Sequence, residues 1–149
     1  MTNTSKFFER LGKLIPGFSG YYNRESLREN DYQLRLLISR KIENLVLQIE
    51  KSKPFLSDDA LLEIDKIQNN LKLFCVKVTN QSYSYSAIFD KTNADKDMRE
   101  DKLNSLIEND EKLVDLIEIL PIENNEIEDL VILEKKLTGL LAQRKEIFR

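Results

Sequence analysis

Histidine and tryptophan are absent from this sequence of 149 residues, and cysteine occurs once, as Cys75. Without histidine, the usual forms of a His-based catalytic triad, of a zinc site with His or several Cys ligands, and of the Glu-x-x-His di-iron site are excluded. One cysteine also excludes an intramolecular disulfide, so the simplest setting for the fold is the cytoplasm. We therefore predict a protein that is not an enzyme and that holds no cofactor and no metal.

Glycine and proline are scarce, at four and three residues. A sandwich or barrel of many short strands needs many more turn residues, so an all-β fold is excluded. The sequence also lacks a run of about 18 apolar residues, which a transmembrane segment needs. Charged side chains interrupt the apolar residues of the first 15 positions, which is unlike the apolar centre of a secretory signal.

Charged residues make up 33% of the sequence and hydrophobic residues 41%, a mixture that suits amphipathic helices. The net charge is −3, and an acidic chain is a poor partner for nucleic acid, where affinity comes from neutralised phosphates. The charge is unevenly spread, with +4 over residues 1–53 and −7 over residues 54–149. This polarity favours attraction between the halves of the chain, or head-to-tail association of copies.

Apolar residues recur at spacings of three and four over four long stretches, and Pro54 and Pro121 end the first and the third. Residues 82–86 also alternate by two, which is a strand signal, but we favour helix to about residue 89 because no partner strand is visible. The long helices are expected over residues 24–53, 58–89, 97–120 and 125–149.

A short amphipathic helix over residues 5–14 and an aromatic Pro/Gly turn over residues 16–22 precede the long helices. Short links between the long helices make neighbours antiparallel. The predicted fold class is therefore all-α, an antiparallel up-down four-helix bundle over residues 23–149 that is preceded by the N-terminal helix and turn of residues 1–22, in one domain. Pairing with a partner chain as a coiled coil is the alternative, but the short links favour closure within the chain.

Asp31 is the most informative single residue, because it lies on the apolar stripe between Leu27 and Leu34. A buried carboxylate is costly unless it is paired and hydrogen-bonded. We predict a structural role, in which Asp31 binds an arginine and backbone amides of the turn at residues 17–21 and so holds that turn to the bundle. The alternative is a polar pocket for an anion or for a partner's backbone. The candidate polar site comprises Asp31, Arg24, Arg28, Arg35 and Tyr21.

Asp110 interrupts the apolar stripe of residues 97–120 in the same way. Two acids on buried faces can meet and bind a cation, although no spacing in the sequence supports it. Residues 93–97 resemble the start of a calcium loop but lack its glycine at position six and its glutamate at position twelve, so we interpret them as a solvated linker. Cys75 is interpreted as a small core residue, and Tyr83 and Tyr85 as packing residues.

One face of residues 5–15 is apolar, and such a short helix is marginal without a surface to lie on. Either the helix folds onto the bundle, or it is an anchor for a protein partner or a membrane surface. The basic residues Lys6, Arg10 and Lys13 on its polar side favour anionic lipid. The candidate interaction face comprises Phe7, Phe8, Leu11, Leu14 and Ile15.

Residues 15–21 contain a Pro-Gly-x-x-Gly-Tyr turn, and residues 24–31 read Arg-Glu-x-x-Arg-Glu-x-Asp. This segment resembles the start of small uncharacterised bacterial helical proteins. The resemblance covers about residues 5–40 and implies a bacterial origin, but no specific activity.

These observations predict a non-enzymatic interaction or scaffold protein of the cytoplasm that binds a protein partner or itself. Two alternatives remain open. One is a peripheral membrane protein that is anchored through residues 5–15. The other is a bundle that binds a small ligand or an ion with Asp31, Asp110 and its tyrosines.

Overall fold

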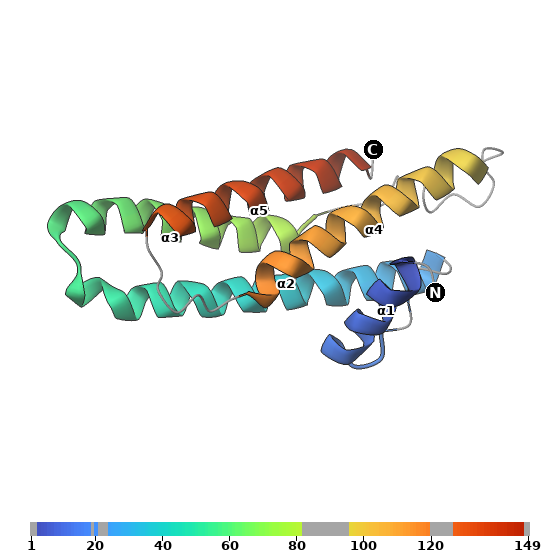
Figure 1. Cartoon of the computed structure of the whole chain (residues 1–149), viewed down its shortest axis with the longest axis horizontal. Coiled ribbons are helices and arrows are strands. Elements are labelled where there is room, and N and C mark those ends of the chain that lie inside the picture. Colours follow the sequence, from blue (N-terminus) through green and yellow to red (C-terminus); the bar gives the residue numbers. More distant parts are fainter. Residues whose placement is uncertain (1–2, 19, 21–23, 82–95, 120–126, 148–149) are drawn as a thin grey trace.

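The computed structural model describes residues 3–18, 20, 24–81, 96–119 and 127–147. These residues form five α-helices and no strand, which confirms the all-α class (Figure 1). The helix expected over residues 58–89 ends at Thr79, because Asn80, with φ of −100° and ψ of 6°, leaves the helical conformation, so the expectation is wrong at residues 80–81. Residues 82–89, the calcium-loop segment up to residue 95, and Tyr83 and Tyr85 lie outside the described residues. The α-helices are α1 (Asn3–Leu14), α2 (Arg24–Ser52), α3 (Asp58–Thr79), α4 (Lys96–Glu118) and α5 (Ile127–Ile147), and a 3-10 turn, η1 (Lys53–Phe55), joins α2 to α3.

Local sequence explains the boundary between α2 and α3. Pro54 lies in η1 and cannot continue the α2 hydrogen-bond pattern, because it has no backbone N–H. Ser57 is the N-cap of α3, and its Oγ accepts a hydrogen bond from the backbone N–H of Ala60 at 3.3 Å. Asp58 and Asp59 follow in the first turn, where negative charge is favourable. Ser57 and the two aspartates therefore stabilise the start of α3 locally.

The turn after α1 depends on its two glycines. Gly17 has φ of 81° and Gly20 has φ of 90°, values that side chains with a Cβ rarely adopt. The backbone N–H of Phe18 donates to the carbonyl of Ile15 at 3.2 Å, which closes the first part of the turn. Asn30 of α2 donates through Nδ2 to the carbonyl of Gly20 at 2.7 Å, so α2 holds the turn in place.

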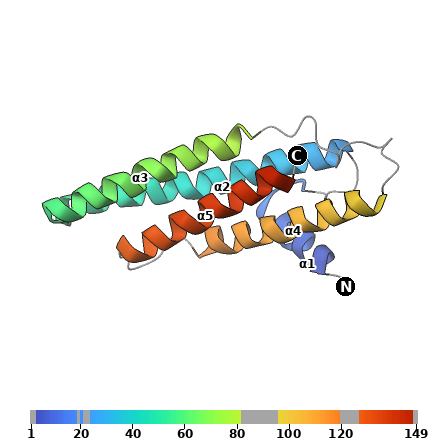
Figure 2. The same ribbon diagram turned by 90° about the horizontal axis from the view of Figure 1, so that it is seen from above.

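One hydrophobic core draws buried side chains from all five α-helices. The four residues Leu34, Leu71, Ile107 and Leu137, one from each long helix, are at most 6% exposed, as the apolar stripes predict. Helix α2 packs against α3, α3 against α5, α5 against α4, and α4 against α2 (Figure 2). Among the described helices, none contains a stretch apolar and long enough to cross a membrane.

Candidate functional site

Asp31 is fully buried on α2, and its carboxylate is paired with arginine, as predicted. Arg35, one helical turn later, donates from Nε to Oδ2 of Asp31 at 2.9 Å. Nη1 of Arg35 donates to the carbonyls of Val78 and Thr79 at 3.1 and 2.8 Å. These carbonyls belong to the last turn of α3, where no intrahelical donor follows, so Arg35 satisfies them and complements the helix dipole.

A second arginine, Arg144 of α5, also binds Asp31, and the sequence reasoning did not identify it. Arg144 is completely buried, and its Nη2 contacts Oδ1 of Asp31. Its Nε donates to Oδ1 of Asp110 at 2.8 Å, and its Nη1 donates to the side-chain oxygen of Gln81 at 2.8 Å. The planar guanidinium therefore binds two carboxylates and an amide at once. Its five N–H donors point in fixed directions within one plane, a geometry that an ammonium group does not have.

The two buried acids singled out in the sequence thus do meet, and the cation between them is a side chain of the same chain. We call Asp31, Arg35, Asp110 and Arg144 the buried charge network. Two carboxylates and two guanidiniums balance in formal charge, which is the condition under which buried charges are tolerated. The described residues contain no group of three or more acidic or cysteine side chains that is arranged to hold a metal ion.

The signal for Arg144 was present in the sequence. It follows Leu137 by seven positions and Leu141 by three, so it continues the buried stripe of α5. A cation on an apolar stripe is the same kind of signal as Asp31 and Asp110, the acids on the apolar stripes of α2 and α4. Neighbouring Asn109 is also buried, and it donates from Nδ2 to the carbonyl of Leu140 at 3.0 Å, which adds a second polar link between α4 and α5.

The other members of the predicted polar site are not part of the buried charge network as the structure describes it. Arg28 is half-buried on α2. The side chain of Arg24 and the whole of Tyr21 lie outside the described residues. The observed hydrogen bond from α2 to the Gly20 carbonyl is made by Asn30, the neighbour of Asp31, and not by Asp31 itself.

The candidate interaction face of α1 is folded onto the rest of the molecule. Phe7, Leu11 and Ile15 are at most 3% exposed, and Phe8 and Leu14 are half-buried against the core. The structure therefore places three of the five candidate side chains where no partner or lipid reaches them. Phe8 also packs against Phe18 of the turn, with ring centroids 5.9 Å apart.

Arg10 holds the polar side of α1 to α4. Its Nη1 contacts Oδ1 of Asp115 at 2.6 Å, and its Nη2 contacts Oε2 of Glu118. The hydrogen bond to Glu118 is the largest influence that raises the pKa of Arg10 above its ordinary value, followed by the bond to Asp115. The basic side of α1 is thus directed in part at acidic groups of the same chain.

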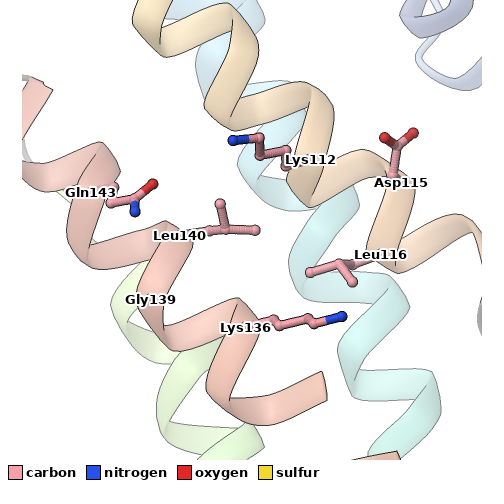
Figure 3. Close-up of a pocket in the computed structure, with 7 residues that line it drawn as sticks. All are labelled: Lys112, Asp115, Leu116, Lys136, Gly139, Leu140 and Gln143. Carbon is pink, nitrogen blue, oxygen red and sulfur yellow. The ribbon is translucent and has the colours of Figure 1, made fainter. Parts of the chain in front are cut away.

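A groove of about 440 Å³ opens between α4 and α5. In Figure 3 the side chain of Leu140 points from α5 toward α4, and that of Leu116 points from α4 toward α5. Gly139 leaves the groove open, because a Cβ at this position meets no atom within 4 Å. Lys112 and Lys136 carry positive charge on either side of this apolar surface.

Two exposed isoleucines extend the same helix faces. Ile119 follows Leu116 by three positions and is 59% exposed, and Ile132 precedes Lys136 by four and is 51% exposed. The acid that lines the groove, Asp115, is already bound by Arg10. The groove therefore has an apolar centre and an excess of positive charge, on a chain whose net charge is −3.

Cys75 is buried on α3, as the sequence indicated, and its Sγ lies 3.7 Å from the carbonyl oxygen of Ser39. Burial raises the pKa of its thiol to about 11, so the reactive thiolate is scarce near neutral pH. The residue is a packing element and not an activated nucleophile.

No family model, no curated protein and no solved structure matches this chain.

Proposed function

We propose that this protein is a non-enzymatic interaction protein that binds a helical segment of a protein partner in the groove between α4 and α5. The observation that carries the proposal is the apolar surface of Leu116 and Leu140, open at Gly139 and extended by exposed Ile119 and Ile132. An exposed apolar strip between two helices is the surface that an amphipathic helix covers.

The scaffold for this groove is, in our proposal, the antiparallel up-down four-helix bundle expected from the sequence. The cyclic contacts of α2 with α3, α3 with α5, α5 with α4 and α4 with α2 support it. The chain direction drawn in Figure 1 supports it too, since α2 and α4 run from right to left and α3 and α5 run back. A buried charge network that joins α2, α4 and α5 favours a framework that is rigid enough to present a preformed groove.

The partner's chemistry follows from the charges that flank the groove. Lys112 and Lys136 favour a helix whose leucine stripe lies between acidic rows, because opposite charges across an interface increase association and suppress wrong partners. A partner helix with basic rows meets the same two lysines with like charge. We therefore propose an acidic amphipathic helix as the ligand class.

A designed peptide tests this function directly. The probe is a helical peptide of about 18 residues, roughly 27 Å long, with a leucine stripe between two rows of glutamate. We expect it to shift the amide NMR signals of α4 and α5 in the isotope-labelled full chain. The matched peptide with lysine in place of glutamate is expected to bind at least about tenfold more weakly, a difference of about 1.4 kcal/mol.

Gly139 supplies the matched variants of the protein. Gly139→Glu fills the groove and repels the acidic peptide without a steric clash in the folded chain, so it should abolish the signal shifts. Gly139→Ala adds one methyl group in open space and should leave binding nearly unchanged. Equal binding by both variants, or no shift in α4 and α5 with the glutamate peptide, would overturn the proposal.

Membrane anchoring through residues 5–15 is disfavoured, because Phe7, Leu11 and Ile15 are buried against the rest of the chain. Binding of a small ion between Asp31 and Asp110 is also disfavoured, since Arg144 occupies the space between the two carboxylates. The cytoplasmic setting and the bacterial origin stay predictions from the sequence.

A further inference from the structure

A second groove, of about 430 Å³, lies between α2 and α3 and belongs to neither the buried charge network nor the α4–α5 groove. Two exposed aliphatic side chains line it, Leu47 of α2 at 61% exposure and Val76 of α3 at 55%. Leu73, one helical turn before Val76, is 51% exposed as well. Figure 2 draws the α2–α3 pair on one side of the molecule and the α4–α5 pair on the other.

We propose that the outer face of α2 and α3 is the self-association surface of this protein, and that a second copy of the chain covers it. The charges that line this groove are one acid on one wall, Glu43 of α2, and one base on the other wall, Lys72 of α3. A two-fold axis that runs along the groove places α2 of one copy opposite α3 of the other. Glu43 then faces Lys72 of the second copy, and the reverse contact forms by symmetry.

The α4–α5 groove lacks this self-complementarity. Lys112 and Lys136 line its two walls, and its acid Asp115 is bound by Arg10, so a two-fold pairing there sets like charges against each other. Like charges that oppose each other across an interface are costly. A second copy of the chain therefore fits the α2–α3 groove and does not fit the α4–α5 groove.

The size of the face suits a dimer. Helix α3 has 22 residues and is about 33 Å long at the usual rise per residue. Two adjacent helices, each about 10 Å wide, offer a face of roughly 650 Å² in projection, and the accessible area of side chains on it is larger. A standard interface buries about 800 Å² on each partner, which is of the same order as the size of this face.

Reversal of the two charges tests the pairing. Light scattering on the full chain should give a mass twice that of the 17.5 kDa polypeptide. Glu43→Lys and Lys72→Glu, each made alone, should return the mass to that of one chain, because each sets like charges opposite each other. The double variant carrying both substitutions should restore the doubled mass, since the pair is then re-formed with its signs exchanged.

Glu43 and Lys72 are exposed, so these variants should fold, and circular dichroism checks that they do. Lys112→Glu, a matched reversal on the α4–α5 groove, should leave the mass unchanged and separates this surface from the one proposed for the helical partner. A wild-type mass of one chain up to roughly millimolar concentration would overturn the proposal. So would single reversals that leave the dimer intact, or a double variant that stays monomeric.

Discussion

Arg144 and Lys53 make nearly the same set of contacts in two different settings. Each cation lies between two carboxylates and beside a glutamine: Arg144 has Asp31, Asp110 and Gln81, and Lys53 has Glu50, Asp65 and Gln68. Arg144 and both of its acids are fully buried, whereas the side chains of Glu50 and Asp65 are 59% and 52% exposed. The comparison separates the effect of burial from the effect of contact geometry.

Exposure to water explains why the two clusters should contribute differently to stability. Around Lys53, solvent screens each charge and replaces any partner that is removed, so an ion pair contributes little. Around Arg144, the charges have lost their hydration, and removal of one partner leaves the others uncompensated in a medium of low polarity. The same three contacts are therefore nearly dispensable in one place and essential in the other.

The two clusters also join residues at different separations along the chain. Lys53 binds residues of α2 and α3, the two helices that meet at η1. Arg144 binds Asp110 and Gln81, which are 34 and 63 positions away, and also Asp31 of α2. A buried network that joins three of the long helices favours one register of α5 against α2 and α4, because a helix shifted by one turn leaves its charges unpaired.

The largest expected effect is that of Arg144→Ala. It leaves Asp110 buried without the guanidinium of Arg144 and leaves Asp31 paired with Arg35, and we expect the free energy of unfolding to fall by about 3–5 kcal/mol. Urea denaturation measures the loss. Lys145→Ala, the exposed neighbour on the same helix, is the matched control and should change stability by less than about 0.5 kcal/mol. Equal effects of the two substitutions would show that burial does not set the value of this cluster.

Lys53→Ala is expected to have a smaller effect on the free energy of unfolding than Arg144→Ala, and the effect should shrink as salt is added. The Debye length falls from about 10 Å to about 3 Å between 0.1 and 1 M salt, which screens the exposed pairs of Lys53 but not the buried pairs of Arg144. Urea denaturation of both variants at the two salt concentrations checks this. A loss for Lys53→Ala that is independent of salt would show that solvent does not screen the ion pairs of Lys53.

The smallest effect is a change in the titration of Glu50. Hydrogen bonds from Lys53, first, and from Gln68 lower the pKa of Glu50 below its ordinary value of 4.5. The carboxylate of Glu50 therefore stabilises the folded state at pH values above the pKa that Glu50 has in the unfolded chain. This stability is lost as the pH falls through the lower pKa that Glu50 has in the folded chain. Carboxyl NMR of the full chain should show the lowered pKa, and Lys53→Ala should raise it. An unchanged Glu50 titration in that variant would contradict the assignment.

Much of this fold follows from local sequence. The apolar spacing and Pro54 predicted both ends of α2 and the start of α3 to within one residue, because periodicity and proline act within one or two turns. The end of α3 at Thr79 was not predicted, since the apolar stripe favoured helix to about residue 89. The pairing of Asp31 with Arg35 was also predictable, since residues four apart lie on one helix face.

The candidate sites were less predictable. The grooves exist only where two helices meet, and single-helix patterns do not reveal which faces meet. The docking of α1 is of the same kind, because its apolar face alone fits a core, a partner or a membrane equally well.

By itself, the order of side chains determined that this protein is helical and which face of each long helix is apolar, because helix periodicity is a property of neighbouring residues. Only the packed structure decided that Asp31 and Asp110 meet at Arg144, and that Phe7 and Leu11 lie in the core. Those outcomes depend on how far each helix is shifted and rotated against the next. That geometry is fixed by how much apolar area is buried and how well the buried charges are paired over the whole chain. No single segment of the sequence fixes it.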